Sequence, residues 1–163
     1  MKANMKIAIT GHRPNKLWND YNLISQPMQN IKKALVELVR EHKPTHLISG
    51  MALGIDTLWA LIAVEHNIPL IAAIPCTNQE KAWPENSKKR YRSILKQIGV
   101  QISMITPDEY TPECMQLRNE WMVDNCDLLI AVWDGTKGGT ANCVRYASQV
   151  GKPMIVLDPN NYL

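Results

Sequence analysis

Residues 134–147, DGTKGGTANCVRYA, place a glycine pair between an apolar run and a stretch with helical spacing. Gly138 and Gly139 let backbone N–H groups approach an anion closely, and Thr140 adds a hydroxyl group. The amino terminus of a helix favours a phosphate there, because its free N–H groups and its dipole both attract negative charge. The segment is not a Walker loop, since no Gly-Lys-Ser/Thr follows. A flexible surface turn is the alternative, because Gly-Gly is common in loops.

A second turn with two glycines, SGMALGIDTLWA at residues 49–60, opens another expected helix. Its glycines allow the same close approach of amides, and the helix contributes about half a positive charge. An aspartate at the helix start either caps the helix or binds a ribose hydroxyl. A plain strand-to-helix turn is the alternative, and the spacing is not the Gly-x-Gly-x-x-Gly dinucleotide fingerprint. The predicted ligand-binding residues of this turn are Ser49, Gly50, Met51, Gly54 and Asp56.

A third segment, TGHRP at residues 10–14, carries side chains suited to phosphate and proton chemistry. Gly11 follows an apolar run, Arg13 suits phosphate recognition, and His12 is a candidate proton carrier. The alternative for a lone histidine or arginine is a structural or solvated role. No Ser-His-Asp, Cys-His or His-Glu-x-x-His arrangement is detectable, so hydrolytic chemistry would rest on carboxylates and water.

The segment 81–96, KAWPENSKKRYRSILK, has six lysines and arginines against one glutamate. A solvated helix face is the usual meaning of such a charge run. A contact with nucleic acid and a basic rim that draws an anionic ligand inward are the alternatives. Trp83 and Tyr91 are candidates for stacking on a base, with a packing role as the alternative for both.

Strand-like and helix-like patterns alternate along the chain, and these patterns must position the candidate residues. Continuous apolar strands favour a parallel sheet covered on both faces. We therefore predict an α/β fold, a single doubly wound Rossmann-like domain over residues 1–163 with a mainly parallel sheet of about six strands. Ligands in such folds bind beyond the carboxyl ends of the strands, where the three glycine- and histidine-bearing segments above and a fourth, PCTNQEKAW at residues 75–83, are expected to lie. Strands are expected at 6–10, 45–49, 69–75, 100–106, 127–133 and 153–158, and helices at 27–42, 55–67, 85–98, 112–125 and 140–150.

Composition narrows the class of protein. The length of 163 residues suits one domain, and a net charge of +3 fits an anionic ligand without demanding nucleic acid. The four cysteines form no Cys-x-x-Cys pair, so we expect no metal site and no cofactor. No secretory signal and no apolar run near the ~18 residues of a membrane span are present, so a cytoplasmic protein with reduced thiols is expected.

Taken together, these motifs resemble the SLOG superfamily, which includes YpsA-like proteins, the DNA-processing protein A domain and the Lonely Guy phosphoribohydrolases. ISGMALGIDTLWA is similar to the Ser-Gly-x-Ala-x-Gly-Ile-Asp signature of DNA-processing protein A. TGHRP, QEKAW and LRNEW follow the YpsA-like pattern in the same order. The resemblance spans nearly the whole chain and implies a Rossmann-like fold that binds nucleotides or nucleotide derivatives. It also implies a homo-oligomer, since related proteins tend to form dimers.

The phosphoribohydrolase branch cleaves N-glycosidic bonds with an arginine and a glutamate. By resemblance, Arg118 falls on the arginine position and Thr140 on the motif threonine, whereas Cys143 stands where the family has glutamate. The Pro-Gly-Gly that precedes this motif is replaced by Trp-Asp-Gly. Asp56 and Asp134 are the candidate substitutes for the missing carboxylate, which makes them, with Arg118, the candidate catalytic residues.

The sequence thus predicts a protein that binds a nucleoside monophosphate or an ADP-ribose-like nucleotide derivative, in sensing or sequestration. Asn142 is expected to contact a polar edge of this small molecule. An N-glycosidic hydrolase acting on nucleoside monophosphates is the first alternative. A module that binds single-stranded DNA, like DNA-processing protein A, is the second, and its basis is the basic segment 81–96 with the SGMALGID match.

Overall fold

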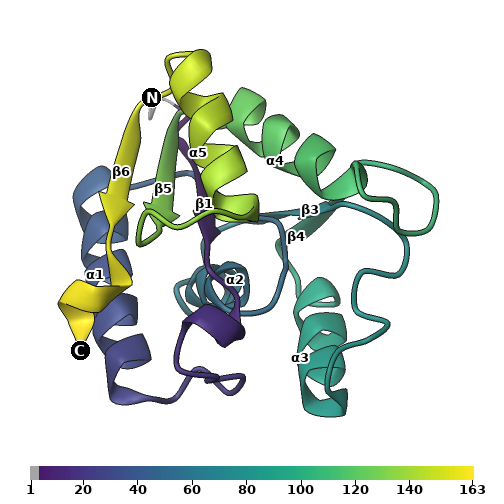
Figure 1. Ribbon diagram of the computed structural model, residues 1–163, viewed down its shortest axis with the longest axis horizontal. Coiled ribbons are helices and arrows are strands. Elements are labelled where there is room, and N and C mark those ends of the chain that lie inside the picture. Colours follow the sequence, from purple (N-terminus) through teal and green to yellow (C-terminus); the bar gives the residue numbers. More distant parts are fainter. Residues whose placement is uncertain (1–3) are drawn as a thin grey trace.

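In the computed structural model, which describes residues 4–163, six strands form one sheet in which every neighbouring pair is parallel. The spatial order is β4-β3-β2-β1-β5-β6 (Figure 1). This arrangement confirms the predicted α/β fold. The strands are β1 (Lys6–Gly11), β2 (His46–Ser49), β3 (Leu70–Ile74), β4 (Val100–Met104), β5 (Leu128–Val132) and β6 (Met154–Leu157).

Strands β3 and β5 are apolar along their whole length because both faces of the sheet are covered. Every residue of β3 and of β5 is buried, and these strands read LIAAI and LLIAV. Edge strand β4 has only exposed or partly exposed residues, in agreement with its weaker sequence pattern. Continuous apolar runs are typical of parallel strands packed on two sides.

The five α-helices within residues 4–163 cover the sheet in two groups (Figure 1). Side chains of α1, α2 and α3 share one core cluster with residues such as Ile7 and Ile9 of β1, whereas α4 and α5 share the other cluster with Ala8. Successive residues of a strand point to opposite faces of the sheet, so β1 contributes side chains to both core clusters. The helices are α1 (Gln26–His42), α2 (Ile55–Glu65), α3 (Glu85–Leu95), α4 (Cys114–Asn125) and α5 (Gly139–Gln149).

Local sequence explains where several helices begin. Ser25 caps α1 by accepting a hydrogen bond from Met28 N at 3.4 Å. Helix α4 begins at Cys114, two residues after the predicted start at Pro112, and Thr111 Oγ1 accepts a hydrogen bond from Cys114 N. None of the helices within residues 4–163 has the length and apolar character that a bilayer-crossing segment requires.

The strand order reverses between β1 and β5, because β1 to β4 extend to one side and β5 and β6 to the other. Two segments lie at the carboxyl ends of this central pair: the short 3-10 helix η1 (Pro14–Lys16) after β1 and the start of α5 after β5 (Figure 1). A crevice outside the carboxyl ends at such a switch point is the usual ligand position in open α/β sheets.

Candidate functional site

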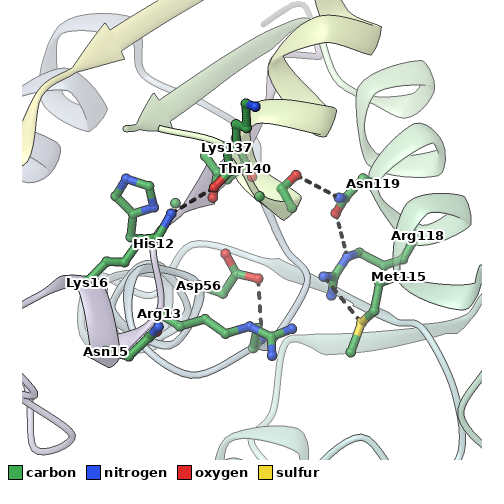
Figure 2. A pocket seen from close by; sticks show the side chains of 15 residues that line it. His12, Arg13, Asn15, Lys16, Asp56, Met115, Arg118, Asn119, Lys137 and Thr140 are labelled. Atoms are coloured by element: carbon green, nitrogen blue, oxygen red, sulfur yellow. Dashed lines mark hydrogen bonds between the residues drawn. The ribbon is translucent and has the colours of Figure 1, made fainter. Parts of the chain in front are cut away.

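A cavity of about 290 Å³ opens at the carboxyl ends of β1 and β5 (Figure 2). Eight of the predicted site residues line it: Gly11, His12, Arg13, Asp56, Arg118, Gly138, Gly139 and Thr140. Seven further lining residues were not predicted: Thr10, Asn15, Lys16, Ala52, Met115, Asn119 and Lys137. The turn after β1, the start of α2, the first half of α4 and the start of α5 therefore converge on one space.

The amino terminus of α5 forms one wall of the cavity. Gly138 is the residue before the helix and has φ +143°, a conformation that side chains other than glycine rarely adopt. No side chain among residues 4–163 caps this helix. The first N–H groups of a helix have no partner within the helix, so those of Gly139 and Thr140 are available to an anion.

Cationic side chains surround this helix terminus. Lys16 Nζ donates hydrogen bonds to Thr136 Oγ1 at 2.9 Å and to the Lys137 carbonyl oxygen at 2.8 Å. These two bonds tie the loop after β5 to η1, so both walls of the cavity are held together. Arg13 and Lys137 are exposed at the same rim. The rim therefore attracts anions before they contact the helix.

Arg118 reaches the cavity from α4 and is buried, with 5% of its surface exposed. Its Nη1 donates to the Gly50 carbonyl oxygen at 2.6 Å, and its Nε donates to Asn119 Oδ1 at 2.9 Å. Asn119 Nδ2 in turn donates to the Gly139 carbonyl oxygen at 3.4 Å. This chain of hydrogen bonds links the guanidinium group to the first residue of α5 (Figure 2).

Asp56 is a buried carboxylate in the first turn of α2 and faces the same cavity. Its Oδ2 accepts a hydrogen bond from Ala52 N at 3.3 Å. Desolvation by burial raises the pKa of Asp56, and the nearby charges of Arg118 and Arg13 counteract that rise. Among the described residues that line the cavity, Asp56 carries the one carboxylate group.

The turn at residues 49–54 supports the cavity from behind, and of this turn only Ala52 lines it. Ser49 Oγ donates to the Asp56 carbonyl oxygen at 2.7 Å and accepts a hydrogen bond from Met51 N at 3.1 Å. A Cβ atom on Gly54 would lie 2.6 Å from the His12 carbonyl oxygen, so glycine permits this close crossing of two turns. Gly50 is packed just as closely against the guanidinium group of Arg118.

His12 and Asp134 form a pair beside the cavity. His12 Nε2 lies 2.8 Å from Asp134 Oδ1, and the imidazole ring is 4% exposed. Hydrogen bonds from the Thr136 side chain and, more weakly, from His12 hold the pKa of Asp134 well below its usual value. Asp134 does not itself line the cavity, but it is bonded to His12, which does.

Trp83 and Asn142 lie outside the cavity. The ring of Trp83 makes an edge-to-face contact with Tyr91, with ring centroids 5.2 Å apart. Asn142 is exposed on α5, and its Oδ1 accepts a hydrogen bond from Arg145. The contact with Tyr91 corresponds to the packing alternative for Trp83.

Cys143 is fully buried in the core between the sheet and helices α4 and α5. Burial raises the pKa of this thiol to about 12. The position at which the phosphoribohydrolase pattern has a glutamate therefore carries a neutral, apolar group.

Comparisons with known proteins identify the family and the fold of the chain. A profile of the YspA SLOG family matches residues 7–157. The SPbeta prophage-derived protein YoqJ of Bacillus subtilis is 34% identical over 128 residues, which cover 69% of this chain and 75% of that protein. DNA processing protein A of Streptococcus pneumoniae has a similar structure, with a TM-score of 0.67 at 20% identity. That likeness covers 94% of this chain but spans only half of the pneumococcal protein.

A second solved structure, DNA processing protein A of Helicobacter pylori, aligns with a TM-score of 0.63 at 22% identity. The alignment covers 96% of this chain and 70% of that protein, whose described property is a single-stranded DNA binding mode. At these identities the two structures show a shared fold. The family match confirms the resemblance to the SLOG superfamily, and the chain belongs to the YspA SLOG family.

Proposed function

We propose that the cavity binds a nucleotide or nucleotide derivative, with a phosphate group at the amino terminus of α5. The observation that carries this proposal is the uncapped start of α5 at Gly138, which opens into a cavity that Lys16 and Lys137 also line. Helix N–H groups and flexible cations together are the usual means of holding a phosphate.

The remainder of the cavity suits the sugar of such a ligand. Asp56 offers carboxylate oxygens to ribose hydroxyl groups, and Thr140 and Asn119 add polar atoms to the same lining. The volume of about 290 Å³ is close to the lower end of ordinary small-molecule sites. Sensing or sequestration is the role that we attach to this binding.

Titration calorimetry with a panel of nucleoside monophosphates and diphosphates tests the proposal. Lys137→Ala removes a rim cation, and we expect it to weaken binding about tenfold, since one charge-assisted hydrogen bond is worth that much. Lys33→Ala is the matched control, because Lys33 is an exposed lysine of α1 that does not line the cavity. The absence of binding to the whole panel, or equal losses in both variants, would contradict the proposal.

N-glycosidic hydrolysis is a second candidate, favoured by one observation: the buried carboxylate of Asp56 shares the cavity with Arg118. A carboxylate stabilises an oxocarbenium-like centre, and an arginine positions a phosphate. Chromatography of the free base after incubation with nucleoside monophosphates is the test. Base release that Asp56→Asn abolishes would support hydrolysis, and no release above the buffer blank would exclude it for the substrates used.

Binding of single-stranded DNA, the property described for the Helicobacter pylori protein, is a weaker candidate for this chain. The basic segment 81–96 contributes no residue to the cavity, and Arg90 is instead bonded to the Tyr21 carbonyl oxygen. A steep loss of oligonucleotide affinity with added salt would support this candidate. Self-association is a separate prediction, which light scattering on the purified chain checks.

A further inference from the structure

The cavity contains a second group of cations besides those at the start of α5. The guanidinium group of Arg13 extends beneath Asp56 toward that of Arg118 (Figure 2). Both arginine charges act on Asp56, and Arg13 also acts on Arg118, so the three groups are electrostatic neighbours. One carboxylate therefore faces two guanidinium groups.

In the part of the chain that the structure describes, no carboxylate oxygen lies within ion-pair distance of Arg13 or Arg118. The ion pairs within 4.0 Å among residues 4–163 join other residues, such as Lys32 with Glu65. Burial lowers the pKa of Arg118, which reflects the cost of keeping an under-neutralised guanidinium group away from water. Its hydrogen bonds to Gly50, Asn119 and Met115 Sδ use three of its five N–H groups.

The balance of charge exceeds what a single phosphate neutralises. Four cationic side chains line the cavity, Arg13, Lys16, Arg118 and Lys137, and one carboxylate, Asp56, opposes them. The α5 terminus adds about half a positive charge. A phosphate monoester carries about −1.5 to −2 at neutral pH, so one such group leaves an excess of positive charge.

We infer that the ligand carries two adjacent phosphate groups, as a nucleoside diphosphate or a diphosphate-bridged nucleotide does. One group lies at the start of α5 near Lys16 and Lys137, and the other is held by Arg13 and Arg118. Arginine suits the second position, because its planar fork binds two phosphate oxygens at once. This inference rests on the proposed function and adds the number of phosphates to it.

Calorimetry with matched pairs of ligands tests the inference: orthophosphate against pyrophosphate, and a nucleoside monophosphate against the diphosphate of the same base. We expect the two-phosphate member of each pair to bind at least about tenfold more tightly, the value of one added charge-assisted contact. Arg13→Ala should weaken the two-phosphate member far more than the one-phosphate member, so that the preference falls to about twofold or less. Arg13 is exposed, so its removal leaves the core intact.

Arg40→Ala is the matched control, because Arg40 is an exposed arginine in the last turn of α1 and does not line the cavity. It should leave both affinities unchanged. Equal binding within both ligand pairs, or an Arg13→Ala loss that is the same for one and two phosphates, overturns the inference and leaves the proposed function standing. A short single-stranded oligonucleotide that binds more tightly than pyrophosphate overturns the assignment to a diphosphate. Failure of every phosphate compound to bind overturns the proposed function itself.

Discussion

Substituting Gly50 with alanine displaces Arg118 without removing its charge. Gly50 follows β2, and a Cβ atom built on its backbone would lie 2.6 Å from Arg118 Cζ and 2.8 Å from Arg118 Nε. The three nearest atoms to that Cβ atom all belong to the guanidinium group. The added methyl group therefore acts on Arg118 and forces it out of its present position.

The cost follows from the contacts that the guanidinium group loses. Its bonds to the Gly50 carbonyl oxygen and to Asn119 Oδ1 are 2.6 and 2.9 Å long. A hydrogen bond to a charged group contributes about 1.5–3 kcal/mol, and a guanidinium group that turns into the cavity regains part of this from water. We expect Gly50→Ala to lower the free energy of unfolding by about 2 kcal/mol. For a domain of this size the melting temperature should fall by about 4–8 °C.

Denaturant unfolding of a double-mutant cycle measures this effect. The cycle comprises the wild type, Gly50→Ala, Arg118→Met and the double variant, and methionine retains an unbranched apolar stem at position 118. Gly50→Ala should cost less than about 1 kcal/mol in the Arg118→Met background, because the colliding group is absent. The same cost in both backgrounds would refute the reasoning. In ligand titrations, Gly50→Ala should also lose most of the wild-type preference for pyrophosphate.

Three further predictions concern stability and reactivity. Hydrogen bonds hold the pKa of Asp134 below its ordinary value of 3.8, so the charged carboxylate stabilises the fold above that pH. This stabilisation is lost as the pH falls further below 3.8. Asp134→Asn should therefore make the free energy of unfolding less dependent on pH on the acid side. Gly54→Ala should destabilise the fold far more than Gly99→Ala in urea titrations, because both glycines have φ near +87° but only the first Cβ atom would meet the His12 carbonyl oxygen. The thiol of Cys143, buried and with its pKa raised to about 12, should react with iodoacetamide only as fast as the protein unfolds, which mass spectrometry after timed quenching measures.

The sequence was sufficient to predict the sheet and the position of the cavity. Apolar runs such as LIAAI and LLIAV lie on buried parallel strands, as expected. The alternation of strands and helices along the chain also allows only a few topologies of a parallel sheet. The glycine pair at residues 138–139 was recognisable because a strand precedes it and a helix follows it. Lys16 and Lys137 were missed, although each lies within three residues of a predicted site residue, and this proximity was the available signal.

The different environments of the two glycine turns were not predictable from the sequence, because they depend on contacts between distant segments. In the turn at residues 49–54, Gly54 packs against the His12 backbone and Gly50 packs against the Arg118 guanidinium group. These two glycines therefore permit close contacts within the protein. The turn at residues 138–139 has open space around it, apart from Lys16 Nζ, which lies 3.7 Å from a Cβ atom on Gly138. Trp83 illustrates the same limit, since its packing against Tyr91 depends on how the loop before α3 folds back.

The central claim is that the first amides of α5 hold a phosphate group. The most direct measurement is a proton–nitrogen correlation spectrum of the full chain, recorded during titration with a nucleotide from the calorimetry panel. We predict that the amide protons of Gly138, Gly139 and Thr140 move downfield together and saturate at the calorimetric dissociation constant, while amides of α3 remain unchanged. Saturable binding that leaves these three amide signals in place, or shifts only signals of α3, would contradict the account.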